Sequence, residues 1–552
     1  MGTVRLKGCR YQCAPSGKTY AYQAITLAIV LFGALSSAGD SKAQLVLSPN
    51  VDISEAIEVE TKKKVATFLP GVRSSFTYST NSNLVDNNSP TKSSDFILEI
   101  TPYVTAQSDA ARFRYRLDYS IANLFRSRTN DRILGRQRLS SNLTAAVAGD
   151  WLWLDASGLI ANTYTDLFGP LSSDPNISFV NSSQIRTFSL SPYVRSRFGG
   201  LVDGTFRYGL QYTDTSRSLP EQSKFNNTVS ADLRGVQADG QNWNWSWSGE
   251  FQRRQFGTTN VDRRYASGSL FWVPTPSVRL SGIAAFDQID GLIARNGDRQ
   301  GVGGGFGIDW NPLERTNISI RTLKRYYGNS GQASLSHSAN WLVFSANYAK
   351  GVTGSLDSSV FSIDPGSVFS AGATTNNPVY LQLIAQNLRL GYGIPYAAGV
   401  IEDTYIQQQQ AGASLGLIGI RNSLTFSLYG SQRDSSLFVK AVPTGGSGPR
   451  GGGVGISSSF NGLIRIYTAS ADYRYKFDAR TDFNAALTGI RTEAPVTSLA
   501  SRSNTVSAGI STLLTPDTKA GAGVRRTVGQ TKGLIDTKFD DTAIYGILDV
   551  RF

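Results

Sequence analysis

The sequence has almost no sulfur and almost no histidine. Its two cysteines, Cys9 and Cys13, and its only methionine, Met1, lie at the extreme N-terminus, and His337 is the only histidine in 552 residues. Disulfide frameworks, thiolate metal sites and histidine-rich metal sites are therefore excluded from the rest of the chain. We expect no metal and no cofactor.

Long hydrophobic runs are also missing, except for one near the N-terminus. The segment Gly2–Lys18 is basic and has no acidic residue, and an apolar stretch follows from Ala21 to Leu35. Ser41-Lys42-Ala43 then places small residues at the two positions that a signal peptidase reads. We therefore expect a signal peptide over residues 1–43, cleaved before Gln44. The alternative, a short transmembrane anchor, would need about 20 apolar residues.

Beyond residue 43 no apolar run approaches the length of a membrane-spanning helix, yet 11% of the residues are aromatic and 55 are glycine. A membrane protein without membrane helices must be a closed β-barrel, because only helices and closed sheets satisfy every backbone polar group in lipid. The formal charge is +13. The basic residues are spread and not clustered, so the charge does not indicate nucleic-acid binding.

Alternation with a period of two organises the chain. From Phe113 to Ile121 every second residue is apolar, and the residues between them are Arg114, Arg116, Asp118 and Ser120. Successive side chains of a strand point to opposite faces, so this pattern predicts strands with one apolar and one polar face. Similar patterns occur in 206–212, 243–251 and 469–477.

The connections predict how these strands are joined. Short turns rich in Gly, Pro, Asn and Asp alternate strictly with longer polar stretches, which is typical of an up-and-down membrane barrel. We predict an all-β transmembrane antiparallel up-and-down β-barrel of about 22 strands, within a range of about 18–24, over residues 71–552. Residues 44–70 would be a periplasmic N-terminal segment, and both termini would be periplasmic. The stretch 350–404 fits an external loop, an inward constriction, or an extra hairpin around Tyr380–Tyr392.

Several aromatic residues lie beside the short turns, as an interfacial girdle at one rim would. They are Trp151, Trp153, Phe198, Trp243, Trp272, Trp310, Trp341 and Phe477. The lone His337 fits an interfacial ring near this rim better than a catalytic base, because nothing nearby specifies a nucleophile or an orienting acid. We expect no catalytic residue and no enzymatic activity.

Two glycine runs were candidates for phosphate-binding loops. Gly303–Gly307 and Gly451–Gly455 do not fit the dinucleotide spacing, and neither opens a helix. We expect the first run to allow close backbone approach inside a strand, and the second to belong to an external loop.

The polar face of the predicted strands is rich in arginine. The candidates for basic residues of the barrel lumen are Arg114, Arg116, Arg195, Arg197, Arg207, Arg234, Arg279, Arg321 and Arg474. Glu99, Asp118, Asp232 and Asp472 share this face. Such a lumen is either polar and mutually charge-paired, or basic enough to favour anionic solutes.

The end of the chain and several internal stretches resemble known proteins. Ala543–Phe552 alternates and ends on Phe552, which resembles the signal read by the barrel assembly machinery of outer membranes. Other stretches resemble a family of outer-membrane proteins associated with the PEP-CTERM exosortase and exopolysaccharide system. They are Ile100–Val104 with its echo Leu190–Val194, Trp310–Pro312, and Gly419–Thr425, within likenesses that span Trp310–Tyr348 and Tyr405–Arg433.

This resemblance implies an outer-membrane pore or scaffold that assists exopolysaccharide export or surface assembly in a Gram-negative bacterium. The residues themselves leave a general diffusion porin or small-solute transporter open, and a hydrolase would depend wholly on His337. We expect as partners outer-membrane lipids and lipopolysaccharide, the barrel assembly machinery and, for the first function, an anionic exopolysaccharide with its export machinery.

Overall fold

The computed structural model describes residues 66–128, 132–164, 168–170, 182–215, 224–236, 241–256, 259–290, 292–294, 298–354, 405–434, 438–440, 462–533 and 536–552. The predicted signal peptide, the periplasmic segment up to residue 65, nearly all of the stretch 350–404 and the run Gly451–Gly455 lie outside these residues. Within them, no helix is long and apolar enough to cross a membrane.

The described residues form 24 β-strands. Their bounds are β1 Ala66–Ser79, β2 Asp95–Ala110, β3 Phe113–Arg126, β4 Arg132–Ala148, β5 Leu152–Tyr164, β6 Ser182–Phe198, β7 Val202–Thr215, β8 Lys224–Gly235, β9 Trp243–Phe256, β10 Thr259–Thr275, β11 Val278–Asp290, β12 Leu292–Ala294, β13 Gln300–Leu313, β14 Thr316–Arg325, β15 Gly328–Ser338, β16 Leu342–Gly354, β17 Tyr405–Ile418, β18 Asn422–Asp434, β19 Phe438–Lys440, β20 Leu463–Lys476, β21 Thr481–Ala494, β22 Leu499–Thr515, β23 Thr518–Lys532 and β24 Thr537–Arg551.

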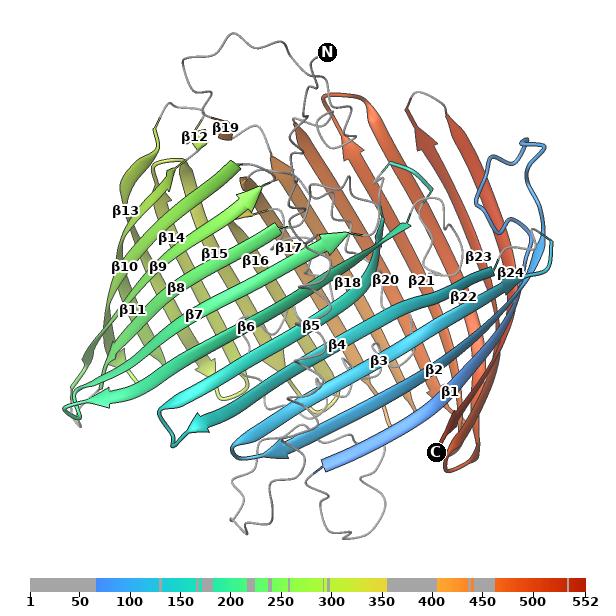
Figure 1. The fold of residues 1–552 in the computed structure, drawn as a ribbon, viewed down its shortest axis with the longest axis horizontal. Helices are drawn as coiled ribbons and strands as arrows, with labels where there is room; N and C mark the ends of the chain where they lie inside the picture. The colour runs from blue at the N-terminus through green and yellow to red at the C-terminus, as the bar shows by residue number, and fades with distance from the viewer. Residues whose placement is uncertain are drawn as a thin grey trace, which may run out of the picture. The chain divides into compact units, whose positions relative to one another are not determined.

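Twenty-two of these strands close into one antiparallel barrel, and β12 and β19 form a separate two-stranded sheet. Each barrel strand pairs with its neighbour in sequence, and β24 pairs with β1 from Gly71↔Arg551 to Ser79↔Ala543. Figure 1 shows the first strands (blue) beside the last (red). Closure leaves no unpaired edge strand, which is what a membrane requires of a sheet. The predicted fold class and strand number are confirmed.

The connections differ from the prediction in one respect. One end of the barrel, which we call the short-turn end, has only short turns, but the opposite, long-connection end also has short ones: β14 ends at Arg325 and β15 begins at Gly328, and β21 ends at Ala494 and β22 begins at Leu499. Strict alternation of short and long connections is therefore wrong. The polar residues at this end predicted loops. In the structure they continue the strands, because their backbone groups remain hydrogen-bonded to the neighbouring strands.

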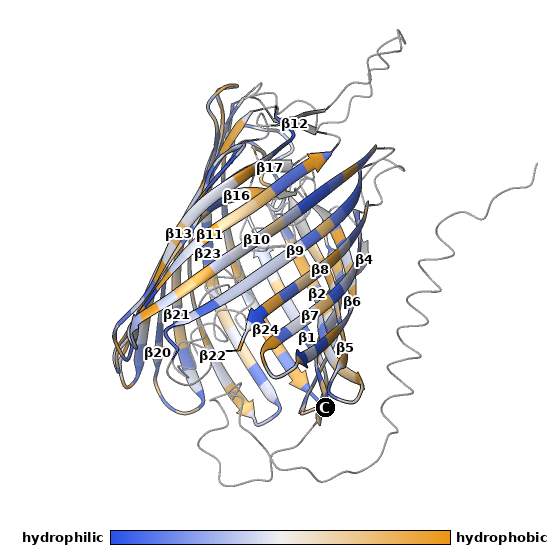
Figure 2. Ribbon diagram, turned by 90° about the vertical axis from the view of Figure 1, so that its left-hand side faces the viewer, coloured by the Kyte–Doolittle hydropathy of each residue, from blue (hydrophilic) through white to orange (hydrophobic). Residues whose placement is uncertain are grey.

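The two faces of the barrel differ as the alternation predicts. Large exposed apolar side chains such as Phe76, Trp247 and Val506 share one face, and most buried side chains, for example Arg254 and Thr527, belong to the other. Side chains converge on the concave side of a closed sheet and spread apart on the convex side, so the apolar face is the outer one. Figure 2 shows hydrophobic and hydrophilic residues following one another along the strands.

The aromatic rim is confirmed at the short-turn end. Its outer members are exposed, Trp243 by 55% and Trp341 by 62%, and Trp243 stacks on Trp272 with ring centroids 5.8 Å apart. Trp153 is the exception, because it pairs with Tyr193 across β5 and β6 on the inner face. Trp153 therefore points into the barrel and is not part of the girdle.

Glycines allow two strands to approach closely on the inner face. A Cβ on Gly305 of β13 would lie 1.9 Å from the backbone oxygen of Thr322 on β14, and one on Gly303 would lie 2.3 Å from that of Lys324. A Cβ on Gly304, which points outward, would have nothing within 4 Å. The run therefore permits a close backbone approach, as expected from the sequence.

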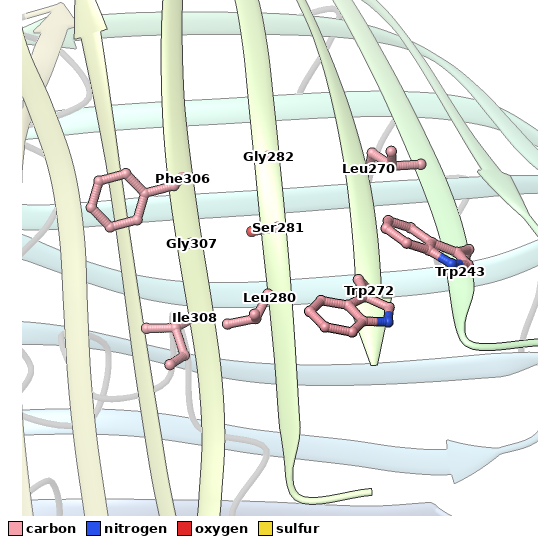
Figure 3. A pocket seen from close by; sticks show the side chains of 9 residues that line it. All are labelled: Trp243, Leu270, Trp272, Leu280, Ser281, Gly282, Phe306, Gly307 and Ile308. Atoms are coloured by element: carbon pink, nitrogen blue, oxygen red, sulfur yellow. The ribbon is translucent and has the colours of Figure 1, made fainter. Parts of the chain in front are cut away.

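Small residues also leave a hollow on the outer face (Figure 3). Its volume is about 540 Å³, and Gly282 of β11 forms its floor between Leu270 and Trp272 on one side and Phe306 on the other. The lining is almost wholly apolar. This hollow faces away from the lumen, so it is not part of the candidate site described next.

Candidate functional site

All nine arginines predicted to line the lumen lie on the inner face. Strand pairing assigns each of them to the parity opposite to the apolar residues of its strand. Basic side chains outnumber acidic ones on this face of the described strands. The strands do not share these charges equally, since no charged side chain lies on the inner face of β15, β16, β17 or β22.

Five of the nine arginines come together near the short-turn end of β3 to β8. We call them the arginine cluster: Arg114, Arg195, Arg197, Arg207 and Arg234. Arg207 lies opposite Tyr193 in the register of β6 and β7, and Arg195 is two residues further along the same face of β6. Asp203 lies opposite both Arg197 and Arg234. Arg114 lies opposite Thr144, which lies opposite Asp155. These five arginines thus lie on one stretch of the inner face.

Asp155 of β5 anchors the centre of the cluster. Its Oδ2 accepts a hydrogen bond from Nη1 of Arg207 at 2.8 Å, and its Oδ1 accepts one from the hydroxyl of Thr144 at 2.9 Å. The Arg207 guanidinium lies 4.2 Å from the ring centroid of Tyr193. Tyr193 is nearly parallel to Trp153, with an interplanar angle of 15° and centroids 6.4 Å apart.

Three members of the cluster make no ion pair. Among the described residues, no carboxylate oxygen lies within 4 Å of the guanidinium of Arg114, Arg195 or Arg234, and all three side chains are exposed. Arg197, by contrast, donates to both oxygens of Asp203, at 2.7 and 3.2 Å. The cluster therefore presents three arginines without an ion pair to the lumen. The carboxylates of Asp109 and Asp203 lie on the strands opposite Arg114 and Arg234, but not within 4 Å of their guanidinium groups.

The other four predicted arginines are paired elsewhere. Arg279 and Arg321 both approach Asp309, with Nε of Arg279 at 2.8 Å and Nη2 of Arg321 at 3.6 Å from its Oδ2. Arg116 donates to Asp118 at 3.2 Å, and Arg474 pairs with Asp482. These side chains make the lumen polar but offer less free charge than the cluster.

The sequence identified the arginines better than their partners. Of the four acidic residues expected to oppose them, only Asp118 makes an ion pair with a predicted arginine in the described part of the chain. The pairs of Arg207, Arg197, Arg279 and Arg474 use Asp155, Asp203, Asp309 and Asp482. Alternation shows which face a residue occupies, but only the strand register shows which residues lie opposite each other. Trp153, Tyr193 and Asp155 were missed as site residues for the same reason.

Residues 168–170, between β5 and β6, contact distant strands near the long-connection end. Phe168, between β5 and β6, is 7% exposed and packs with Ile464 and Ile466 of β20 and Ala494 of β21. The backbone oxygen of Gly169 accepts a hydrogen bond from the hydroxyl of Ser501 on β22 at 3.1 Å. Strands β5 and β6 lie far from β20–β22 around the barrel wall, so residues 168–170 link opposite walls.

A second link joins two connections at the same end. β12 lies between β11 and β13, β19 lies between β18 and β20, and the two short strands pair from Leu292↔Lys440 to Ala294↔Phe438. Figure 1 shows them together beyond the barrel wall. Six barrel strands separate the two connections, so their pairing joins distant parts of this end of the barrel.

The remaining candidates are simpler. The ring of His337 lies on the outer face, and its Nδ1 shares a hydrogen bond of 2.8 Å with the hydroxyl of Thr316. No group of three or more His, Cys, Asp or Glu side chains among the described residues could hold a metal ion. The backbone N–H of Phe552 donates to Pro70 at 2.9 Å and its side chain is 75% exposed. Its role in assembly stays a prediction.

Comparison with known proteins gives architectural likeness alone. No protein-family model matches the chain, and no curated protein matches it. Among solved structures, the siderophore receptor PirA from Acinetobacter baumannii is 10% identical, with 89% of this chain and 81% of that chain covered and a TM-score of 0.45. The FrpB iron transporter from Neisseria meningitidis (F5-1 variant) is 8% identical, with 88% and 82% covered and a TM-score of 0.43. OpdK from Pseudomonas aeruginosa, solved with vanillate, is 9% identical, with 88% and 99% covered and a TM-score of 0.32.

Proposed function

We propose that this protein is an outer-membrane channel that admits small anionic solutes, with its short-turn end facing the periplasm. The observation that carries the proposal is an inner face with more basic than acidic side chains, on which Arg114, Arg195 and Arg234 make no ion pair among the described residues. Fixed positive charge inside a low-dielectric wall raises the local concentration of anions and lowers that of cations.

The links across the long-connection end favour small solutes. Phe168 and the β12–β19 pairing join distant parts of the barrel at this end, and we expect them to restrict the path that a solute takes into it. A barrel of 22 strands without such links would be wide enough for a large aqueous lumen. A restricted entrance suits a porin or small-solute transporter better than a wide polymer conduit.

The exopolysaccharide role is a second candidate. The arginine cluster at the short-turn end would face the periplasm, where it could receive an anionic polymer, and this is the observation in its favour. The role stays a prediction, as does the absence of enzymatic activity. Deleting the gene tests it, because unchanged extracellular polymer in the deletion strain would contradict it.

The ion preference of purified, refolded protein tests the main proposal. In a planar bilayer with a KCl gradient, the zero-current potential should have the sign of an anion-preferring pore. A potential of the opposite sign would contradict the proposal. A correctly folded barrel that never conducts would contradict it as well.

A further inference from the structure

We propose that Trp153, Tyr193 and the arginines around them form a binding site for a carboxylate carried on a ring, either an aromatic acid or an acidic sugar. The inference rests on the proposed function, because such a ligand must reach the lumen. Beyond the proposed function, the aromatic side chains would bind the ring of the ligand and the arginines would bind its carboxylate. The two ligand sources share one chemistry, an anionic carboxylate beside a flat or partly apolar ring face.

The aromatic part of the site is held in place from several sides. Nε1 of Trp153 donates to the backbone oxygen of Asp150 in the β4–β5 turn at 2.9 Å. Tyr193 lies nearly parallel to Trp153, and the Arg207 guanidinium covers the Tyr193 ring at 4.2 Å. Arg207 is fixed in turn by Asp155. Because these contacts hold the side chains in one arrangement, little ordering is needed when a ligand binds.

The charged part of the site is ready for a carboxylate. Arg195 lies two residues from Tyr193 on the same face of β6, and Arg114 lies on β3, across β4 from Asp155. Neither arginine has a carboxylate partner within 4 Å among the described residues. Arginine binds carboxylates through paired N–H groups, which gives both strength and orientation. Asp155, the carboxylate already present, is occupied by Arg207 and Thr144 and leaves these two arginines free.

The combination distinguishes this site from the other arginines of the lumen. Arg279 also lies over an aromatic ring, with its guanidinium 5.1 Å from the Phe271 centroid, but it is hydrogen-bonded to Asp309. Near Tyr193, free arginines and a two-ring aromatic surface occur together. A small anion such as chloride or acetate could use only the arginines, whereas a ring carboxylate could use both.

Ligand-induced block of single-channel current tests the inference. Benzoate, glucuronate and acetate would be added in turn at equal concentration to wild-type channels in a bilayer. We expect benzoate or glucuronate, or both, to produce resolved blocking events, and acetate to produce none. Block by benzoate alone would assign the site to aromatic acids, and block by glucuronate alone would assign it to acidic sugars.

Two variants and their matched controls locate the site. Trp153→Leu should weaken the block by about threefold to tenfold, the range expected for one aromatic contact, and Trp153→Phe should restore most of it. Arg195→Gln should weaken it by about tenfold or more, as expected for a charge-assisted hydrogen bond. The controls are Trp310→Leu, a tryptophan of the outer rim, and Arg138→Gln, an inner-face arginine of β4 outside the cluster; both should keep wild-type block.

The outcomes separate this inference from the proposed function. An anion-preferring wild-type channel that acetate blocks as well as benzoate and glucuronate would overturn the inference and leave the proposed function standing. Equal block in Trp153→Leu and wild type would also overturn it, provided that the β-sheet circular dichroism spectrum shows the variant to be folded. A cation-preferring wild-type channel would overturn the proposed function itself.

Discussion

Arg73 on the first strand of the barrel donates two hydrogen bonds to Asp549 on the last, from Nε at 3.0 Å and from Nη2 at 2.8 Å. The other oxygen of Asp549 accepts a hydrogen bond from the Tyr103 hydroxyl at 2.6 Å. Strands β1 and β24 are the first and last strands of the barrel, so their pairing closes it. This carboxylate connects β1, β2 and β24 at that seam.

Removing this carboxylate should weaken closure. We expect Asp549→Ala to lower the free energy of unfolding by about 2 kcal/mol, because it removes charge-assisted hydrogen bonds at a site where Asp549 is only 15% exposed. Urea unfolding of the refolded barrel in detergent measures this. Asp150→Ala is the control, since the Asp150–Arg112 pair is exposed and 3.4 Å long, and it should change little. Equal effects of the two variants would contradict the role of the seam.

The glycines of β13 provide a matched pair of substitutions. Gly305→Ala would place a methyl group 1.9 Å from the Thr322 backbone oxygen, so β13 and β14 would have to separate, at a cost of about 1–3 kcal/mol or more. Gly304→Ala points into open space on the outer face and should be tolerated. Refolding yield and urea midpoint compare the two. A Gly305→Ala barrel as stable as Gly304→Ala would show that the close approach is not required.

The contact of residues 168–170 with β20 and β21 should limit conductance. Phe168→Ala removes the side chain that holds residues 168–170 against β20 and β21, a contact worth about 3–5 kcal/mol for a buried phenylalanine. We expect larger or more variable single-channel conductance in this variant. Phe225→Ala, which removes an exposed phenylalanine of the outer face of β8, is the control and should leave conductance unchanged. Identical conductance in Phe168→Ala and wild type would mean that the connection does not narrow the conducting path.

The β20–β21 turn should make the free energy of unfolding depend on pH. Oδ1 of Asp478 accepts hydrogen bonds from the backbone N–H groups of Arg480 and Thr481, both at 2.7 Å, and these bonds lower the pKa of Asp478 below its ordinary value of 3.8. A lowered folded-state pKa stabilises the fold above the unfolded pKa, and the contribution is lost as the pH falls through the folded-state pKa.

Replacing Asp478 by Asn removes the titrating group and keeps an acceptor oxygen. The difference in unfolding free energy between wild type and Asp478→Asn should be constant at neutral pH and shrink from about pH 5 downward. Unfolding midpoints measured across this range test it. A difference that grows on acidification would have the wrong sign for a lowered pKa.

The sequence predicted the architecture because a closed membrane barrel imposes a simple pattern. Every second residue of a strand such as Phe113–Arg126 meets lipid, so alternation alone reveals strands, faces and the inward position of Arg114 and Arg116. The rim aromatics and the glycine contacts of β13 followed from equally local rules.

The details of the site depend on pairing between strands, which local patterns do not contain. Asp155 lies near Arg207 only because of the registers of β5 with β6 and of β6 with β7. Trp153 seemed to be a girdle residue because it lies close to a turn. Its face could not be predicted, because the residues from Trp151 to Leu154 are all apolar and show no alternation. The contact of Phe168 with β20 joins residues about 300 positions apart, and no period in the sequence signals it.

The zero-current potential across a bilayer in a KCl gradient, measured for wild type and for Arg114→Gln/Arg195→Gln/Arg234→Gln, shows whether the arginine cluster makes the channel prefer anions. Wild type should prefer chloride, and the triple variant should shift clearly toward no preference, while Arg138→Gln should stay close to wild type. A wild-type preference for potassium, or a triple variant that keeps the full preference for chloride, would contradict the account.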